Sequence, residues 1–329
     1  MEKTIRWGIL GPGWISEKFA AALRHVPHAE LYAVGSRSQE RAGAFARKHG
    51  IQRSYGSYER LVEDKDVDVV YVATPHPFHC ANTLLCLEHG KAVLCEKPFA
   101  MNEKEVRLMI TKARERRLFL MEAMWSRFLP SVEKVLELIR TGKIGEVVQM
   151  KSDLGFRAAV NPDGRLYNPA LGGGSLLDVG VYPAFMATLV LGEPDAIRSS
   201  AILSDRGIDT SLSAVLSYRS GALATITCAI TAETATETEI AGTAGTILMH
   251  RKWFMPNPVS VRHHDGRSET YEFSVASNGY EFEAMEVTNC LLEGKTESPR
   301  LPLDFSLKLI RVLDTIRSEQ GIAYEADKS

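Results

Sequence analysis

The sequence has few of the features that define several protein classes. Among its 329 residues there are five cysteines, without CxxC spacing: Cys80, Cys86, Cys95, Cys228 and Cys290. An odd number of scattered cysteines argues against a disulfide framework and indicates reduced, mostly buried thiols in a cytoplasmic protein. No cluster of histidine and cysteine accompanies them, so we expect no metal site.

The sequence also lacks a large excess of positive or negative charge and lacks long apolar runs. The chain carries 39 Lys and Arg against 41 Asp and Glu, a formal net charge of −2. This balance argues against nucleic acid or a membrane surface as the main partner. No uninterrupted apolar run approaches the ~20 residues that span a bilayer, and a strand pattern from Thr4 leaves no signal peptide to expect. A hydrophobic content of 45% is typical of a globular protein.

The first 123 residues alternate between strand and helix patterns. The apolar run Thr4–Leu10 predicts a strand, after which Ile15, Phe19 and Leu23 recur at helical spacing. Further strands are predicted at Ala29–Ser36, Arg53–Tyr55, Val67–Ala73, Ala92–Cys95 and Phe119–Glu122. With helices between them, this order predicts a dinucleotide-binding domain over residues 1–123, built on a doubly wound parallel sheet of the Rossmann type.

From residue 124 the pattern changes to strands with one covered face. Ala222–Ile230, for example, alternates apolar residues with threonines. Other strands are predicted at Val147–Phe156, Ile197–Leu203, Thr210–Tyr218, Thr246–His250, Val259–Arg262 and Glu269–Phe273, with helices near Asp178–Leu191, Glu281–Leu292 and Phe305–Arg317. We therefore predict an α+β domain over residues 124–329, with a largely antiparallel open sheet, for substrate binding and oligomerisation.

The turn Gly11-Pro12-Gly13-Trp14-Ile15-Ser16 joins the first strand to the first helix. Gly11 permits a tight turn, and Gly13 lets the backbone approach a pyrophosphate. Ser16 is small enough for close helix–strand packing, and the free N–H groups of the first helical turn hold the anion. Such a string is weak alone, but its βαβ context favours a dinucleotide site over a plain structural turn.

The end of the second strand points to the identity of the cofactor. NAD-binding folds usually carry an Asp or Glu about 20 residues after the glycines, which bonds the ribose 2′-hydroxyl. Here the chain has Ser36 and Arg37, with Arg41 one helical turn later. A hydroxyl and two guanidinium groups suit a 2′-phosphate, so NADP(H) is favoured over NAD(H), which stays possible. A solvated surface role for Arg37 is the alternative.

Two further loops follow predicted strand ends, where parallel sheets bind their ligands. Thr74, Pro75 and His79 belong to a loop stiffened by two prolines, and we expect them to line the cofactor, with capping of its own helix as the alternative for His79. Glu96 and Lys97 follow the fifth strand. There Lys97 would donate a hydrogen bond to a substrate oxygen and steady developing alkoxide charge. Surface lysines far outnumber functional ones, so the strand-end position carries this prediction.

A glycine-rich stretch, residues 172–174, leads into a predicted helix that contains Asp178 and Tyr182. Four residues apart on a helix, these side chains would share one face. Tyr182 can exchange a proton with a carbonyl if a cation lowers its pKa, while Asp178 would orient the substrate or balance the lysine charge. The structural alternative makes Asp178 a helix N-cap and Tyr182 a core aromatic residue. The residues alone leave both interpretations open.

Taken together, these motifs resemble the glucose–fructose oxidoreductase / inositol dehydrogenase / MocA (Gfo/Idh/MocA) family. The resemblance lies in the ordered set Gly11-Pro12-Gly13, Thr74-Pro75, Glu96-Lys97-Pro98 and Asp178-Val-Gly-Val-Tyr182, which covers essentially the whole chain. Within the family, the segments Met121–Pro130 and Asn168–Asp178 are similar to the branch that contains dihydrodiol dehydrogenase and NADP-dependent D-xylose dehydrogenase.

The resemblance implies specific roles. Lys97 would be catalytic, and Tyr182 would be the acid/base, because this branch has Tyr where many members have His. It implies a subunit interface on the open sheet, often a dimer, and often a cis bond between Lys97 and Pro98. Ser16 departs from the family pattern, where Ala or Gly is commoner, but it is small enough to fit.

Clues to the substrate are fewer. Trp125, Phe156 and Trp253 are candidates for an aromatic wall, because flat apolar surfaces stack on sugar C–H faces and on aromatic rings. Such residues are more often part of a core.

We therefore expect an NADP(H)-dependent oxidoreductase acting on a secondary alcohol or hemiacetal carbon of a sugar, polyol or vicinal diol. Two alternatives remain: a redox-assisted lyase or glycosidase that holds its nicotinamide permanently, and a non-catalytic dinucleotide-sensing protein.

Overall fold

The computed structural model describes residues 3–328 and divides into two compact units. Unit 1 is Met1–Phe128 with Val275–Leu307, and unit 2 is Leu129–Ser274 with Lys308–Ser329. The sequence pattern predicts a single boundary after residue 123. The structure differs because helix α8 (Tyr280–Leu292) packs against the first strand and first helix, and so returns a late segment to unit 1.

Unit 1 contains a parallel sheet of six strands in the order β3-β2-β1-β4-β5-β6, which confirms the predicted doubly wound arrangement. Its strands are β1 Ile5–Leu10, β2 Ala29–Gly35, β3 Arg53–Tyr55, β4 Val69–Val72, β5 Ala92–Glu96 and β6 Leu120–Ala123. Its helical segments are α1 Trp14–Leu23, α2 Gln39–His49, α3 Tyr58–Val62, η1 His76–Phe78, α4 His79–Glu88, α5 Glu103–Arg116, η2 Trp125–Phe128 and α8. The strand order reverses between β1 and β4, and ligands bind at such a switch point in open parallel sheets.

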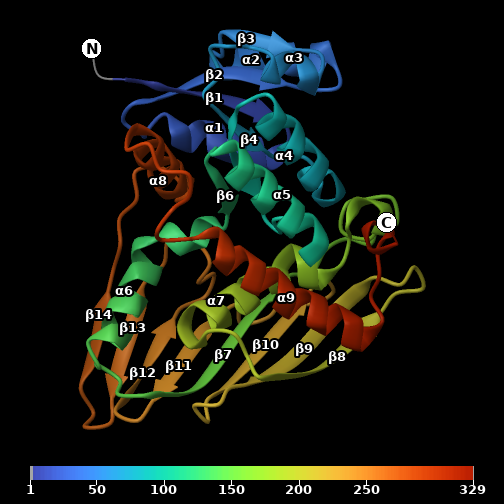
Figure 1. The fold of residues 1–329 in the computed structure, drawn as a ribbon. Helices are drawn as coiled ribbons and strands as arrows, with labels where there is room; N and C mark the ends of the chain where they lie inside the picture. The colour runs from blue at the N-terminus through green and yellow to red at the C-terminus, as the bar shows by residue number, and fades with distance from the viewer. Residues whose placement is uncertain (1–2, 329) are drawn as a thin grey trace. The chain divides into compact units, whose positions relative to one another are not determined.

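Aromatic packing fixes one face of this sheet. Trp7 of β1 lies 5.3 Å, centroid to centroid, from Phe19 of α1, and Phe19 stacks on Tyr71 of β4 at 3.9 Å. All three side chains are fully buried. Figure 1 shows α1 and α8 side by side, in agreement with their contacts.

Unit 2 is built on eight strands in the order β14-β13-β12-β11-β7-β10-β9-β8. They are β7 Val147–Gly155, β8 Ala196–Leu203, β9 Asp209–Ser217, β10 Leu223–Ala229, β11 Thr238–Gly242, β12 Gly245–Met249, β13 Val259–His263 and β14 Ser268–Tyr271. The helical segments are α6 Pro130–Arg140, η3 Pro169–Leu171, η4 Leu176–Gly180, α7 Val181–Leu191 and η5 Glu325–Asp327; α9 (Leu303–Gln320) crosses the division at residue 307. One sheet face is covered by α7, which packs on β7 and β10.

The expected second sheet is confirmed as largely antiparallel, with two features that the pattern did not predict. Strand β7 pairs in parallel with β10, from Gln149↔Leu223 to Gly155↔Ala229. Strand β11 lies on the other side of β7 and was not predicted, because a run rich in Thr and Glu hides its alternation. In that strand Thr238 and Ile240 are buried, and the Ser152 and Thr238 hydroxyls lie 2.7 Å apart.

One stretch within residues 3–328 has the length and apolar character of a membrane span, which sequence inspection did not recognise. It runs from Pro169 to Leu191, with a mean hydropathy of 1.5 over its window, and 83% of that window is buried inside the protein. Because most of this stretch is buried inside the protein, its apolar composition is that of a core helix. All five cysteines are also buried and carry no disulfide, as expected.

Candidate functional site

The glycine turn after β1 has the geometry that its sequence predicts. Gly11 has φ = +90°, and a Cβ there would lie 3.0 Å from the Ala73 carbonyl oxygen and 3.1 Å from the Thr74 methyl group. Glycine is therefore required by both conformation and close approach. At Gly13 the only atom of the described residues that an added Cβ would meet within 4 Å is the Gly11 oxygen, at 4.0 Å. The protein leaves this position open, which fits the approach of a ligand.

The start of α1 is equipped to hold an anion. The Gly13 backbone is extended at the N-cap and no side chain caps the helix within the described residues, so its first N–H groups are left for another acceptor. Ser16 is fully buried, and its hydroxyl donates to the Gly11 carbonyl at 2.7 Å, which explains the small polar residue at this point. Trp14 is 73% exposed beside the turn.

The cationic residues predicted to select NADP(H) lie close to one tyrosine. Arg37 and Arg41 are exposed, and an Arg41 Nη donates to the Pro12 carbonyl at 3.3 Å, which brings α2 to the glycine turn. Burial raises the pKa of Tyr58, whereas the charges of Arg37 and Arg41 act in the opposite direction. The structure thus groups Tyr58 with the two arginines. Sequence reasoning missed Tyr58 because it follows a short third strand, about 20 residues beyond the arginines and without a recognisable motif.

His79 joins two strand-end loops and does not face an open site. Its ring is fully buried, with Nδ1 2.8 Å from the Pro98 oxygen and Nε2 2.7 Å from the Thr74 oxygen. Burial lowers the pKa of His79 to about 4, although both carbonyls favour the protonated ring. The Thr74 hydroxyl also accepts a bond from the Asn82 amide at 3.0 Å. We therefore treat His79 as a residue that holds the Thr74–Pro75 loop, rather than one that touches cofactor.

Glu96 and Lys97 form a rigid strand end. Glu96 is buried, accepts a hydrogen bond from the Tyr71 hydroxyl, and accepts the Lys97 backbone N–H at 3.2 Å. Lys97 is partly exposed, and the Lys97–Pro98 peptide bond is cis, as the family resemblance implied. The buried Glu96 carboxylate therefore holds the backbone from which the lysine side chain extends.

A second buried acid lies near the lysine. The Glu122 carboxylate accepts the Phe99 N–H at 3.1 Å. Burial raises the pKa of Glu122 to about 7, and the positive charge of Lys97 opposes that rise. Glu122 precedes the predicted aromatic residue Trp125, which is buried and stacks on Tyr280 of α8 with centroids 4.3 Å apart.

In unit 2, Asp178 is paired rather than available as an isolated charge. The Arg165 guanidinium bonds both carboxylate oxygens, at 2.6 Å and 3.2 Å, and Asp178 is buried. Asp178 lies inside the π-helical turn Leu176–Gly180, so it is not a helix N-cap, and the α-helical spacing expected between it and Tyr182 does not apply. π-Helical turns of this kind occur frequently at functional sites.

One aromatic neighbour of Tyr182 is Phe254, which is not among the predicted aromatic residues. The Tyr182 and Phe254 rings lie 5.4 Å apart, and Phe254 is half-buried. Trp253 is fully buried, and its indole N–H donates to the Asp153 carbonyl at 3.0 Å, so it is a core residue and we leave it out of the substrate wall. Phe156 remains a candidate, half-buried just after β7.

The glycine-rich loop before Asp178 is fixed by two distant residues. Buried Asp209 of β9 accepts the Ser175 hydroxyl and the Leu176 N–H, each at 2.6 Å. The Tyr324 hydroxyl donates to the Gly173 carbonyl at 2.6 Å. Gly174 has φ = +131°, and a Cβ there would lie 2.5 Å from Asp209 Oδ1. This packing sets the start of the segment that carries Asp178 and Tyr182.

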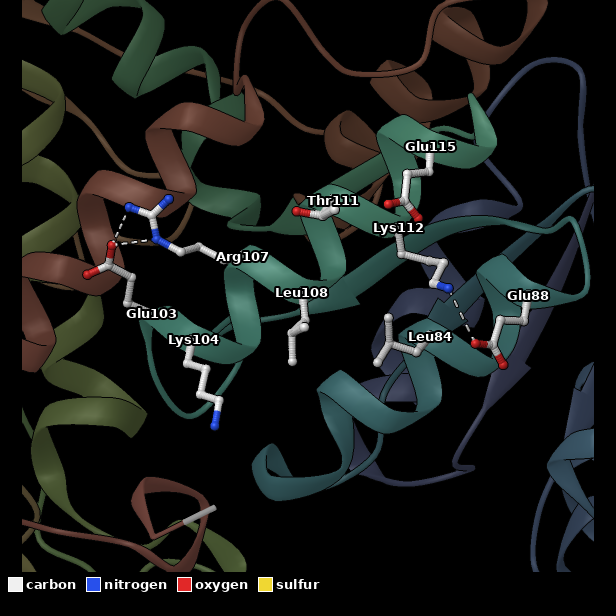
Figure 2. Close-up of a pocket in the computed structure, with 9 residues that line it drawn as sticks. All are labelled: Leu84, Glu88, Glu103, Lys104, Arg107, Leu108, Thr111, Lys112 and Glu115. Atoms are coloured by element: carbon white, nitrogen blue, oxygen red, sulfur yellow. Dashed lines mark hydrogen bonds and ion pairs between the residues drawn. The ribbon is translucent and has the colours of Figure 1, made fainter.

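A groove of about 800 Å³ between α4 and α5 lies elsewhere and contains none of the predicted site residues. Figure 2 shows Leu84 and Leu108 between two ion pairs, Arg107–Glu103 at 2.6 Å and Lys112–Glu88 at 3.6 Å. Because its charges largely pair with one another, the groove offers no reactive group. Within residues 3–328 there is also no cluster of three His, Cys, Asp or Glu residues that would hold a metal.

Comparison with known proteins matches the chain to two domain models of one protein family. The model described as "Oxidoreductase family, NAD-binding Rossmann fold" matches residues 5–124, and the "GFO/IDH/MocA C-terminal domain" matches residues 132–248. Trans-1,2-dihydrobenzene-1,2-diol dehydrogenase of Sus scrofa is 38% identical, over 98% of this chain and 99% of that protein.

Two solved structures share the fold over nearly the whole chain. A 3-ketoreductase from Actinomadura kijaniata, in complex with NADP and TDP-benzene, has a TM-score of 0.86 at 29% identity, covering 97% of this chain and 98% of its own. An aldose-aldose oxidoreductase from Caulobacter crescentus, complexed with glycerol, has a TM-score of 0.88 at 26% identity, covering 96% and 97%.

The contacts of Asp209 generate a prediction about the loop before Asp178. Asp209→Ala leaves the Ser175 hydroxyl and the Leu176 N–H buried without their acceptor, so we expect a loss of about 2–3 kcal/mol in the free energy of unfolding. Urea unfolding followed by circular dichroism measures it. Asp205→Ala, at an exposed position of the same unit, serves as the control and should change stability by less than about 0.5 kcal/mol. Equal stability of the two variants would contradict the role of Asp209.

Proposed function

The chain belongs to the GFO/IDH/MocA family of NAD(P)-binding oxidoreductases, and we propose that it is an NADP(H)-dependent dehydrogenase acting on a secondary alcohol or hemiacetal carbon of a sugar, polyol or vicinal diol. The observation that carries the proposal is the strand end at Glu96–Lys97. A partly exposed lysine follows a buried carboxylate that is itself held by Tyr71. A backbone held in this way suits a lysine that must reach a reacting oxygen repeatedly in one geometry.

The residues at the switch point of the unit 1 sheet fit a dinucleotide. The open space at Gly13 and the uncapped first turn of α1, at Trp14 and Ile15, suit a pyrophosphate. Ser36, Arg37 and Arg41 would hold a ribose 2′-phosphate, with Tyr58 beside them. Backbone groups of Thr74, Pro75 and Glu96 would border the nicotinamide. When bound, the nicotinamide supplies or accepts the hydride.

In the oxidation direction Tyr182 takes the proton of the substrate hydroxyl as general base. Lys97 donates a hydrogen bond to the same oxygen and stabilises the negative charge that develops on it. In reduction the same two groups act in reverse, with Tyr182 returning the proton.

Asp178 would orient the substrate together with Arg165 rather than as an isolated charge. Because the Arg165 guanidinium pairs with both of its oxygens, its negative charge is largely neutralised within unit 2. We propose that the Asp178–Arg165 pair presents a fixed set of donors and acceptors to substrate hydroxyls. Phe156, Phe254 and Trp125 would supply apolar surface for the C–H faces of the substrate.

The substrate class is inferred from the relatives and from the combination of the Asp178–Arg165 pair with aromatic side chains. The relatives are named for a dihydrodiol, a keto group and an aldose, and all three react at a carbon that carries oxygen. A vicinal pair of hydroxyls is common to diols, polyols and sugars. Initial rates with NADP⁺ on a panel of pentoses, hexoses, inositols and trans-diols test the assignment; no turnover on any of them would contradict it.

The proposed catalytic pair generates a prediction about turnover. Lys97→Ala and Tyr182→Phe should each lower kcat by at least ~100-fold, because each removes a group that acts on the reacting oxygen. Binding of NADPH, followed by fluorescence titration, should survive in both. Lys104→Ala and Tyr218→Phe are matched controls: Lys104 is exposed, and the buried Tyr218 hydroxyl has no hydrogen-bond partner within the described residues. Turnover at the wild-type rate in either catalytic variant would refute the assigned roles.

Arg37, just before α2, and Arg41, within it, generate a prediction about the cofactor. Arg37→Ala and Arg41→Ala should each raise the KM for NADP⁺ about 10- to 100-fold, the range expected when a charge-assisted hydrogen bond of about 1.5–3 kcal/mol is lost. The KM for NAD⁺ should change little, because NAD⁺ has no 2′-phosphate. Arg47→Ala, exposed further along the same helix, is the control. A wild-type preference for NAD⁺ would overturn the cofactor assignment.

The uncovered face of the unit 2 sheet supports a homodimer. Register places Val215, Leu223 and Ile202 on this face, and all three are more than 40% exposed, whereas the opposite face carries buried residues such as Ile226 and Leu216. Small hydroxyl side chains, including Ser213 and Thr225, separate them and leave the surface flat enough for a second sheet. We propose that a second copy of the chain packs here.

Val215→Arg should therefore separate the copies, since a charge would be buried in the interface without a partner. Sedimentation equilibrium should give twice the 36.4 kDa chain mass for the wild type and a value near that mass for the variant. Leu108→Arg, at an exposed apolar position on α5, should leave the wild-type mass unchanged. A wild type that sediments as a single chain would exclude this interface.

A further inference from the structure

Glu283 is an acidic residue in a place that the sequence gives no reason to expect. It lies on α8 with zero exposure, on the helix face that also carries the buried residues Tyr280, Ala284 and Val287. Apolar residues at this spacing are what a packed helix needs. A carboxylic acid in the middle of that stripe costs stability, so its presence calls for a function.

The Glu283 side chain also lacks the contacts that normally stabilise a buried carboxylate. Within residues 3–328 neither of its oxygens has a hydrogen-bond partner. Glu281, two residues earlier, shows the contrast: its carboxylate accepts the backbone N–H groups of Ser277, Asn278 and Gly279 at 2.8–3.2 Å. An ionised carboxylate without any donor is too costly to bury, so Glu283 holds its proton.

The charge of Glu96, the acid that precedes the proposed catalytic lysine, acts on Glu283. Burial raises the pKa of Glu283 well above its usual range, and the negative charge of Glu96 raises it further. Strand register places Tyr71 beside Leu94, and Glu96 is two residues further along, so Tyr71 and Glu96 share one sheet face. The Tyr71 hydroxyl donates to Glu96, and the charge of Glu283 would act on Tyr71 as well.

The other elements packed on α8 bring few titratable groups to this face. The buried residues of β1 include Ile5, Trp7, Ile9 and Leu10, and those of α1 are Ser16, Phe19, Ala20, Ala22 and Leu23, none of them an acid or a base. From η2 comes Arg127, whose guanidinium donates to the Arg300 carbonyl at 2.8 Å. Tyr280, on α8 itself, is a further titratable residue on this face. The negative charge of an ionised Glu283 would therefore act mainly on Glu96 and Tyr71.

We propose that Glu283 is a positioning residue for Lys97: as a neutral acid it leaves the Glu96 carboxylate in place, and its ionisation repels Glu96 and loosens the strand end that carries the lysine. Glu96 accepts both the Tyr71 hydroxyl and the Lys97 N–H, so displacement of this one carboxylate disturbs the lysine backbone directly. The inference rests on the proposed catalytic role of Lys97, and it goes beyond that role by adding a residue from the late segment 275–307.

The first arm of the test measures the protonation state of Glu283 independently of activity. A folded-state pKa above the unfolded value of 4.5 means that the folded protein binds a proton that the unfolded chain has released. Stability from this proton is complete below pH 4.5 and is lost as the pH rises towards the folded-state pKa. Relative to Glu283→Gln, the wild-type unfolding constant should therefore grow about tenfold per pH unit in that interval. Glu281→Gln is the control with the opposite sign: the amide replaces one of the two oxygens that accept the Ser277, Asn278 and Gly279 N–H groups, so this variant should destabilise the protein.

The second arm measures positioning through the pH dependence of kcat. As the pH rises from 6.5 to 9.5, wild-type turnover should fall relative to Glu283→Gln by at least threefold, because Gln cannot ionise. Glu283→Leu provides a second neutral side chain of similar volume if the Gln variant does not fold. Superimposable kcat profiles for wild type and variant would reduce Glu283 to a structural role, and a constant ratio of unfolding constants would show that it is not protonated. If Lys97→Ala retains turnover, the proposed catalytic function fails, while the unfolding arm still reports on Glu283.

Discussion

The structure of unit 1 depends on the close approach of Gly11 to the backbone at Ala73 and Thr74. A Cβ at Gly11 would lie 3.0 Å from the Ala73 oxygen, so only glycine lets the ends of β1 and β4 meet at the switch point. From there His79 bonds the Thr74 and Pro98 carbonyls and extends the connection to the end of β5. The three strand ends that would hold a dinucleotide and present Lys97 are thus joined by short contacts to buried groups.

Buried acids are stabilised in two ways in this protein. Glu96, Glu122 and Glu283 of unit 1 are buried, and burial raises the pKa of both Glu122 and Glu283, as it does for Asp209 in unit 2. Asp178 of unit 2 is paired with Arg165 in a two-bond contact instead. Buried acids that hold protons change their charge when the pH passes their raised pKa. An ion pair keeps both of its charges over a wider range of pH.

Much of the fold could be predicted because its signals are local. The apolar run of β4, the turn at Gly11–Gly13 and the alternation in β10 each reflect the conformation of a few consecutive residues. The failures have equally local causes. Strand β11 was missed because Thr and Glu hide its alternation, and the segment 169–191 was not recognised as one apolar stretch because glycines and prolines divide it. Tyr58 and Phe254 were missed because neither lies in a motif, although each adjoins predicted residues.

The sequence by itself determined the Rossmann-type sheet, the mainly antiparallel second sheet, the glycine turn after the first strand and the lysine at a strand end, since periodicity and turn chemistry act between near neighbours. Tertiary structure decided which partner each side chain has. It paired Asp178 with Arg165, enclosed Trp253 while leaving Phe254 beside Tyr182, and returned α8 with Glu283 to unit 1. These outcomes depend on residues tens or hundreds of positions apart, whose contacts arise only when the chain is packed and water is excluded.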